Sequence, residues 1–308
     1  MNTIHEVIEA QVVERVHQAE LPCQPPEGSM ARKRQSNRLT TQHIANHGVE
    51  GIFGEIARKH DLSVDEISTL AMQKLETDFP TLQFRKRKGI TKSEINARLR
   101  EVDEFLDQVL YVPQARIIPD GGIIEVLDDD GKWRVVLVTE AKYQGKDIEN
   151  IRQGVLVGKN KDQDIMAAGN AIERSHKNVK EIANFMLGEQ HFPYVLFLEG
   201  SNFLIETLTI TRPDGREVVL EYNSSNLNRI DRLTAANYAM PINHNLCENR
   251  VVTSRGQAIM LQAASIYTQG LGGEWDSEDM LAIMLDVAKT SIKVLASDLF
   301  DQMTTSGK

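Results

Sequence analysis

Apolar residues recur at helical spacing in several parts of the chain. From about residue 41, TQHIANHGVEGIFGEIARKH has this spacing, and Ser63 with Glu66 forms a capping-box pattern that predicts a second helix through EISTLAMQKLE. The same periodicity predicts helices over VKEIANFML, QAIMLQAASIY and SEDMLAIMLDVAKTSIKVLASDLF. Helices are therefore expected on both sides of a central region with a different pattern.

Strand-like runs occupy that central region. PDGGIIEVLDDDGKWRVVLVTEAK, residues 119–142, indicates two strands around an Asp/Gly turn. PYVLFLEG is a continuous apolar run typical of a buried strand, and ETLTITRPDGREVVLEY predicts a second hairpin that turns at Pro213, Asp214 and Gly215. Together the runs predict an α/β fold with a mixed central β-sheet flanked by helices.

Composition narrows the class of protein. Hydrophobic residues make up 41% of the 308 positions, which is enough for a substantial core. No stretch approaches the roughly 20 apolar residues that span a bilayer, and no leader pattern opens the chain, so we expect a cytoplasmic protein with no membrane partner. Cys23 and Cys247 are the only cysteines. With no zinc-like spacing, any metal is expected to be a hard ion held by oxygen.

Positive charge is gathered locally although the net charge is −9. An acidic surface repels a phosphate backbone unless basic residues cluster. Such clusters occur near Arg32–Arg34 and in FRKRKGITK, residues 84–92. Taken alone, these clusters fit a solvated surface as well as a nucleic-acid contact.

The first hairpin carries the most suggestive chemistry. If it is centred on Asp130, Asp120 lies opposite Glu140, and two carboxylates about 4.5–5.5 Å apart repel each other unless a cation lies between them. Lys142 falls on the same face as Glu140, with Ala141 turned away. This set suits metal-assisted hydrolysis of a phosphodiester.

Spacing alone leaves a simpler interpretation open, in which Glu140 and Lys142 form a weak pair at a solvated hairpin end. Acidic hairpins are common, and a register can slip by one residue. The second Pro-Asp, at Pro213 and Asp214, lies inside its own turn, and the strand after it ends without a lysine. The second hairpin therefore lacks the arrangement of Asp, Glu and Lys that the first hairpin has.

Longer segments carry a more specific resemblance. Pro-Asp followed by Glu-x-Lys resembles the signature of the PD-(D/E)xK nucleases. From Met30 onward, QSNRLT, GIFGE, RVVLVTEAK, QGKDI, DQDIMAAGNAIERSHKN, HFPYVLFLEGSNFL and NRIDRLTAANYAMPIN resemble, in order, the EcoRI family of type II restriction endonucleases. That family includes EcoRI and its isoschizomer RsrI, and differences from EcoRI favour an RsrI-like member.

The resemblance implies a Mg²⁺-dependent homodimer with a restriction-endonuclease-like core. It would cut both strands of double-stranded DNA at GAATTC, after the G, and leave 5′-phosphates. The carboxylates of Asp120 and Glu140 and the main-chain oxygen of Ala141 would bind the metal, and Lys142 would serve the attacking water. A cognate DNA methyltransferase is expected as a genetic partner, because an unprotected host genome would be cut.

The resemblance places base recognition in MAAGNAIER. Asn170 can make a bidentate contact to adenine, and Glu173 with Arg174 can bridge neighbouring bases from one end of a helix. Met166 and Ala167 suit apolar contacts to pyrimidine edges. Without the resemblance, a buried helix start rich in small residues is the simpler interpretation of this segment.

Further DNA contacts follow from the same resemblance. Arg229 and Arg232 match arginines near the recognition interface, although an ion pair with Asp231 also fits their spacing. The expected contacts to the DNA backbone, which set register without reading sequence, are Gln144, Lys146, His176, Lys177, Asn178, Arg85, Arg87 and Lys92. EcoRI has lysine and histidine where this chain has Ile118 and Tyr143, which puts some phosphate contacts in doubt.

The segments outside this core are expected to differ in kind. Residues 1–29 end in the proline-rich LPCQPPEGS and precede the start of the resemblance, so they are expected to be a disordered extension, or untranslated if synthesis begins at Met30. Residues 30–308 would form one endonuclease domain. Within it the polar residues 146–162 would form an arm that embraces DNA.

Three other functions compete with this interpretation. A Mg²⁺-dependent repair or recombination nuclease would use the same hairpin without the segment from Asn170 to Arg174. A catalytically silent DNA-binding protein has no reason to keep Asp120, Glu140 and Lys142 together. A protein-interaction scaffold leaves the basic clusters and paired carboxylates unexplained.

Overall fold

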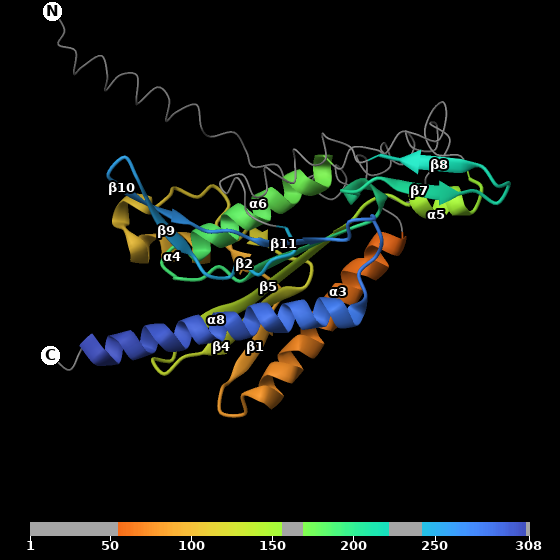
Figure 1. The fold of residues 1–308 in the computed structure, drawn as a ribbon. Helices are drawn as coiled ribbons and strands as arrows, with labels where there is room; N and C mark the ends of the chain where they lie inside the picture. Colours follow the sequence, from red (N-terminus) through yellow and green to blue (C-terminus); the bar gives the residue numbers. More distant parts are fainter. Residues whose placement is uncertain (1–54, 156–168, 222–241, 306–308) are drawn as a thin grey trace, which may run out of the picture. The chain divides into compact units, whose positions relative to one another are not determined.

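A mixed five-stranded sheet lies at the centre of the structure, a computed structural model that describes residues 55–155, 169–221 and 242–305 (Figure 1). β4 is antiparallel to both β1 and β5, whereas β6 is parallel to both β5 and β11. The predicted mixed sheet is confirmed. Its strands, in spatial order, are β1 (Phe84–Arg87), β4 (Gly122–Leu127), β5 (Trp133–Tyr143), β6 (Tyr194–Glu199) and β11 (Ser265–Thr268).

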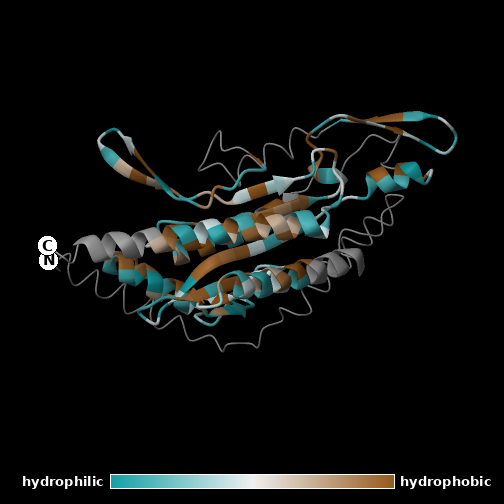
Figure 2. Cartoon of the chain, turned by 60° about the horizontal axis from the view of Figure 1, so that its bottom comes forward, coloured by the Kyte–Doolittle hydropathy of each residue, from teal (hydrophilic) through white to brown (hydrophobic). Residues whose placement is uncertain are grey.

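Helices pack on both faces of this sheet. α3 (Glu55–Asp78) and α8 (Ser277–Thr305) share one buried cluster with strand residues such as Phe197. α4 (Lys92–Val102) and α6 (Gly169–Phe185) share the other cluster, on the opposite face. Successive side chains of a strand point to opposite faces, and the central strands are mostly hydrophobic along their length, as Figure 2 shows. A strand buried on both faces accounts for the continuous apolar runs in the sequence.

Short elements surround this core. β7 (Leu208–Thr211) and β8 (Glu217–Leu220) form the predicted second hairpin, with its turn at the expected Pro-Asp-Gly. Two other small pairs join β2 to β3 and β9 to β10. The remaining elements are β2 (Ile90–Thr91), η1 (Glu104–Leu106), β3 (Arg116–Ile117), α5 (Asp147–Arg152), η2 (Ser201–Phe203), β9 (Arg250–Ser254) and β10 (Gln257–Leu261).

The expected register of the first hairpin holds only near its turn. Leu127 pairs with Trp133, as a hairpin centred on Asp130 requires, but the register shifts by one residue between Ile124 and Glu125. Beyond this β-bulge, Gly122 pairs with Thr139. The expectation that Asp120 lies directly opposite Glu140 is therefore wrong, because a bulge inserts one extra residue into one strand.

Two helix predictions also need correction. The capping-box pattern at Ser63 does not begin a helix, since α3 runs without interruption from Glu55 to Asp78. QAIMLQAASIY is not helical either. Its first part is β10, which turns back on β9 through Arg255 and Gly256, both at positive φ, and its last part lies in β11. Two positive-φ residues between strands are typical of a type I′ hairpin turn.

The predicted arm at residues 146–162 is only partly described. Residues 147–152 form α5, so this part is a short helix and not a loop, and residues 156–162 lie outside the described residues. The extension at residues 1–29 and the start at Met30 also lie outside them. In the part of the chain that the structure describes, no helix combines the length and the apolar character needed to cross a membrane.

A substitution at Gly200, which follows β6, can measure how tightly the end of the sheet is packed. Its φ is +91°, and a Cβ there would lie 2.4 Å from the main-chain oxygen of Gln144. Gly200→Ala should lower the free energy of unfolding by about 2 kcal/mol or more, since strained φ and a backbone clash add. Urea denaturation of the purified variant measures this.

Gly215→Ala is the matched control. Gly215 has a φ of +84°, but no atom lies within 4 Å of the added Cβ. It should lose only the conformational part, about 1 kcal/mol. Equal losses in the two variants would show that the contact between Gly200 and Gln144 is not tight.

Candidate active site

Asp120, Glu140 and Lys142 come together at the open end of the first hairpin. Glu140 and Lys142 lie on β5 two residues apart, and Asp120 lies in the turn before β4. Lys142 Nζ forms an ion pair with Asp120 Oδ2 and lies 2.8 Å from Glu140 Oε1. The predicted convergence of the three groups is therefore present, although the register that brings them together differs from the expected one.

The turn that carries Asp120 depends on two glycines. Gly121 donates its N–H to the main-chain oxygen of Thr139 at 2.9 Å. A Cβ at Gly121 would lie 2.8 Å from Thr139 Cβ. Gly122 has a φ of +79°. A close approach and a left-handed conformation both favour glycine, so the sequence Pro-Asp-Gly-Gly fixes the carboxylate of Asp120 beside β5.

Glu140 has no exposed side-chain surface and is held from two further directions. The Tyr194 hydroxyl, at the start of β6, donates to Glu140 Oε2. The Asn178 amide, on α6, donates to the same oxygen at 2.9 Å. The carboxylate is thus fixed by a neighbouring strand, a covering helix and Lys142.

Burial and charge have opposite effects on the pKa values of Glu140 and Lys142. Burial raises the pKa of Glu140, the nearby Lys142 opposes this rise, and the Asp120 carboxylate adds to it. Burial alone would lower the pKa of Lys142, but Glu140 and Asp120 outweigh it and raise the pKa. Lys142 is therefore charged at neutral pH, and a second positive charge is favoured beside the two carboxylates.

Oxygen ligands for a hard cation are available at this point. The Ala141 N–H faces Asp120 Oδ2 at 3.4 Å, beyond the end of β4. The N–H and C=O of one strand residue point to the same side, so the Ala141 carbonyl also faces this open side. No three His, Cys, Asp or Glu side chains gather as a metal site among the described residues. Two carboxylates and one carbonyl are the set that fits Mg²⁺, which keeps several waters.

Two further acidic residues lie near the end of β5: Asp147 begins α5, and Glu199, the last residue of β6, pairs with Tyr143. Burial raises the pKa of Asp147 to about 6, and it raises the pKa of Glu199 to about 8. Burial, with nearby acids such as Glu149 and Glu274, also raises the pKa of Tyr143. Burial therefore disfavours negative charge on both carboxyl groups at this end of the sheet.

The basic cluster on β1 is engaged within the protein. Arg85 Nε donates to the buried Glu125 at 2.6 Å and its guanidinium lies 4.1 Å from the centre of the Trp133 ring. Arg87 contacts both Glu94 and Glu125. Lys92 is the first residue of α4 and is half-buried. These contacts stabilise the edge of the sheet, and DNA-backbone roles for these residues stay predictions.

The other expected backbone contacts lie in different environments. His176 and Lys177 are exposed on α6, as a phosphate contact requires, and Lys146 precedes α5 and is half-exposed. Gln144 is buried, with 5% of its surface exposed, and Asn178 donates its amide to Glu140. For Gln144 and Asn178 the structure therefore gives no support to a phosphate contact.

The predicted base-reading residues are only partly described. Asn170 and Glu173 lie in the first turns of α6, and Arg174, on the same helix, is exposed. Met166, Ala167, Arg229 and Arg232 lie outside the described residues. Of the two departures from the family, Ile118 is 56% exposed and Tyr143 is the last residue of β5. The base contacts remain predictions.

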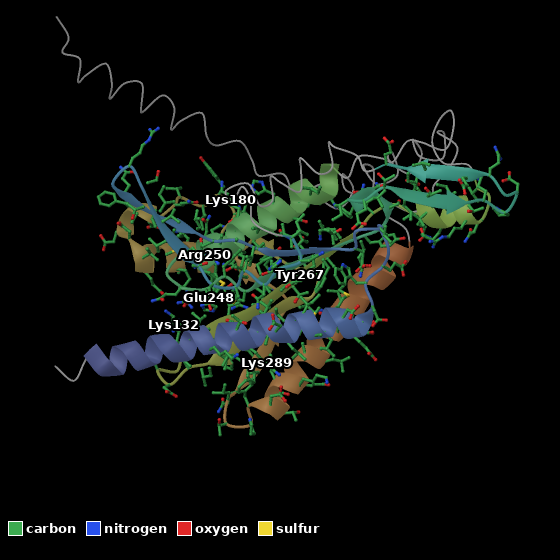
Figure 3. All side chains as sticks on the ribbon, in the orientation of Figure 1. Lys132, Lys180, Glu248, Arg250, Tyr267 and Lys289 are labelled. Carbon is green, nitrogen blue, oxygen red and sulfur yellow. The ribbon has the colours of Figure 1, made fainter. Side chains whose placement is uncertain are left out.

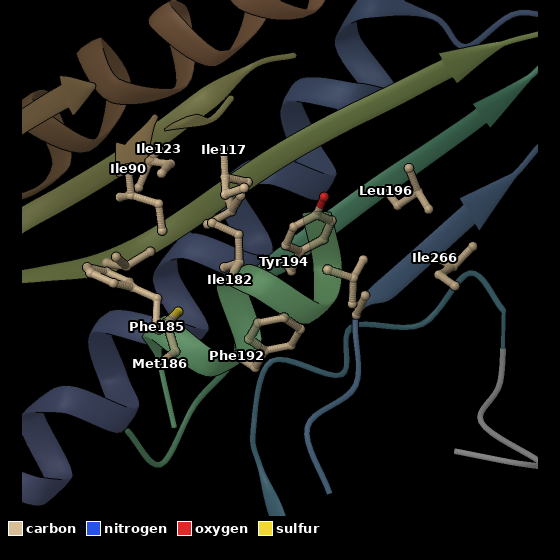
Figure 4. Close-up of a cluster of buried hydrophobic side chains, with 14 of the residues drawn as sticks. Ile90, Ile117, Ile123, Ile182, Phe185, Met186, Phe192, Tyr194, Leu196 and Ile266 are labelled. Carbon is tan, nitrogen blue, oxygen red and sulfur yellow. The ribbon is translucent and has the colours of Figure 1, made fainter. Parts of the chain in front are cut away.

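Sequence reasoning missed Tyr194. It opens the apolar run PYVLFLEG, where a tyrosine resembles any other core residue, and its ring stacks on Phe192 with centroids 5.7 Å apart. In Figure 4 its ring lies among hydrophobic side chains and its hydroxyl oxygen points toward β5. The available signal was that a buried tyrosine hydroxyl usually has a polar partner.

Comparison with known proteins identifies the family. The sequence model of the family "Restriction endonuclease EcoRI" matches residues 46–302 of the chain. Over 276 residues the chain is 63% identical to the type II restriction enzyme EcoRI of Escherichia coli, which covers 90% of this chain and 100% of that enzyme. Over 267 residues it is 52% identical to the type II restriction enzyme RsrI of Cereibacter sphaeroides, with 87% and 96% covered. The expected preference for an RsrI-like sequence is not supported, since identity to EcoRI is higher. The chain belongs to the EcoRI family of type II restriction endonucleases.

Proposed function

We propose that this protein is a type II restriction endonuclease that hydrolyses both strands of DNA at GAATTC, after the G, with Mg²⁺ as cofactor. It would act as a homodimer and leave 5′-phosphates. The observation that carries the proposal is the convergence of Asp120, Glu140 and Lys142 at one end of a hairpin, in a chain that belongs to this family.

The side chains divide the work at the scissile phosphate. Asp120, Glu140 and the Ala141 carbonyl would hold the cation, which supplies a Lewis acid for a phosphoryl oxygen and lowers the pKa of a bound water. The Lys142 ammonium lies beside both carboxylates. From there it can orient the attacking water and neutralise charge that develops on the phosphoryl group. No covalent intermediate with the protein is required.

Recognition would come from a separate element. α6 presents exposed Arg174, His176 and Lys177 and carries Asn170 in its first turn. A helix end in the major groove allows Asn170 to read adenine and Arg174 to contact a neighbouring base, while the basic residues bind phosphate. Because a palindrome has two-fold symmetry, a symmetric dimer would place one site on each strand.

A cutting enzyme of this specificity needs a protected host. Every GAATTC in the genome would be a substrate, so we propose a DNA methyltransferase of the same specificity as the genetic partner. Degradation of unmodified foreign DNA would be the biological role.

Digestion of a plasmid with mapped GAATTC sites tests the activity. With Mg²⁺ we expect fragments whose ends begin with AATTC, and with EDTA we expect intact plasmid, since the carboxylates alone cannot activate water. End sequencing of the fragments makes the measurement. Fragments with scattered ends would favour a repair-type nuclease over a restriction enzyme.

Glu140→Gln should separate cutting from binding. The amide keeps the size of the side chain but loses the charge that holds the cation, so cleavage should fall by about 1000-fold or more. Binding to a GAATTC duplex should persist in a gel-shift assay. Glu76→Gln, an exposed position on α3, is the control and should cut normally. Loss of binding together with cutting would assign Glu140 a structural role.

The oligomeric state gives an independent test. Light scattering after gel filtration should give twice the 34.6 kDa chain mass at the concentration that cuts DNA. A monomer under those conditions, with full cutting activity, would contradict a dimer that reads the palindrome symmetrically.

A further inference from the structure

We propose that Tyr194 and Asn178 are positioning residues for Glu140, and that Asn178 links the position of α6 to the catalytic carboxylate. The inference rests on the proposed function, since it assigns Glu140 to the metal. Neither residue touches the reacting atoms in this arrangement. Both would act through the orientation of one carboxylate.

Two donors from different elements meet on the same oxygen of Glu140. Tyr194 lies on β6 and pairs in register with Val138, which is two residues before Glu140 on the same face of β5. Asn178 arrives from α6, with its amide nitrogen 2.9 Å from Oε2. Both hydrogen bonds use Oε2, so Oε1 is left facing Lys142 at 2.8 Å. The carboxylate plane is thereby fixed, with one oxygen held by the fold and one directed at the site.

A purely structural explanation accounts for only one of the two donors. The Tyr194 hydroxyl is fully buried and needs a polar partner wherever it lies. Asn178 is only half-buried on α6, so its amide depends less on a protein partner than a fully buried hydroxyl does. Its contact with the carboxylate therefore serves Glu140 more than it serves Asn178. Hydrogen-bonded partners of metal-binding carboxylates commonly set their orientation.

The two donors depend on different parts of the molecule. Tyr194 belongs to the sheet, where β6 is paired on both sides with β5 and β11. Asn178 lies one helical turn after Arg174 on α6, the helix proposed to read bases. Any movement of α6 when it engages DNA moves the Asn178 amide relative to Glu140. Asn178 is thus placed to make the geometry of Glu140 sensitive to how α6 lies on the bases.

Tyr194→Phe and Asn178→Ala test the inference directly. The first removes only a hydroxyl and keeps the ring that stacks on Phe192. The second removes the amide from a half-buried position. Tyr267→Phe, a buried tyrosine on β11, and Lys180→Ala, an exposed lysine on α6, are the matched controls (Figure 3).

The primary measurement is Mn²⁺ binding to the full-length dimer on a GAATTC duplex, detected by electron paramagnetic resonance. Mn²⁺ is suitable because carboxylate sites accept it. We expect each test variant to bind Mn²⁺ about 10- to 100-fold more weakly than wild type. The Mg²⁺ concentration that gives half-maximal single-turnover cleavage should rise in parallel. Both controls should match wild type, and melting temperatures should show that all four variants are folded.

Two results would overturn the inference. The first is Mn²⁺ binding by Tyr194→Phe and Asn178→Ala equal to that of the controls. The second is a wild-type protein that binds no Mn²⁺ at all, because Glu140 then holds no metal. If the melting temperature of Tyr194→Phe is far below that of Tyr267→Phe, its Mn²⁺ binding reflects lost stability. The Mn²⁺ binding of Asn178→Ala then decides whether the inference holds. A wild type that binds Mn²⁺ but does not cut GAATTC refutes the proposed specificity and leaves the binding comparison as the test of positioning.

The link through α6 has a separate readout. Cleavage of GAATTC is compared with cleavage of a duplex changed at one base. Tyr194→Phe should slow both reactions by the same factor. Asn178→Ala should slow the GAATTC reaction more, which lowers the ratio of the cleavage rate at GAATTC to the rate at the changed site. An unchanged ratio in Asn178→Ala would show that this residue holds Glu140 without linking it to recognition.

Discussion

Glu140 is held with no exposed side-chain surface, and an ionised carboxylate in that position is stable only if donors or cations surround it. Lys142, Tyr194 and Asn178 supply these partners from β5, β6 and α6. The need to compensate this buried carboxylate fixes the positions of β5, β6 and α6 relative to Glu140. Removing any one partner leaves a buried charge less compensated, so the arrangement of sheet and helix around Glu140 is not free to vary.

The bulge in the β4–β5 hairpin has a direct bearing on this arrangement. Without it, Asp120 and Glu140 would face each other as a repelling cross-strand pair. With the register shifted by one, Asp120 meets the Ala141 N–H, and Lys142 reaches both carboxylates. The bulge thus turns a directly opposed pair into three groups around one open point, which agrees with the frequent occurrence of bulges next to active sites.

Much of the fold and the convergence of Asp120, Glu140 and Lys142 could be predicted from sequence. Continuous apolar strands, the first hairpin and the long C-terminal helix follow from periodicity, and Pro-Asp with Glu-x-Lys marks the site. The bulge could not be predicted, since no glycine or proline marks Ile124 and Glu125. The sequence predicts a helix over β10 because a short apolar run fits both the helical and the strand period. Arg255 and Gly256, both at positive φ, form the turn that makes this segment a hairpin.

The remaining gap concerns contacts between distant parts of the chain. Tyr194 and Asn178 are 54 and 38 positions away from Glu140. No local pattern shows which side chain meets which across such a separation, and the resemblance alone favoured a phosphate role for Asn178. Likewise, the pairing of Arg85 and Arg87 with Glu125 depends on β1 lying beside β4. A basic run in the sequence therefore proved to be partly a set of internal ion pairs.

The parallel pairing of β5 with β6 also sets the order in which the site can assemble during synthesis. The β4–β5 hairpin is local and can form as soon as its residues leave the ribosome, whereas parallel strands need a long crossover between them. Asn178 and then Tyr194 are made only after Glu140. A nascent chain that ends before β6 carries Asp120, Glu140 and Lys142 but lacks the strand that fixes Glu140, so these three groups reach their final arrangement only after β6 has been made.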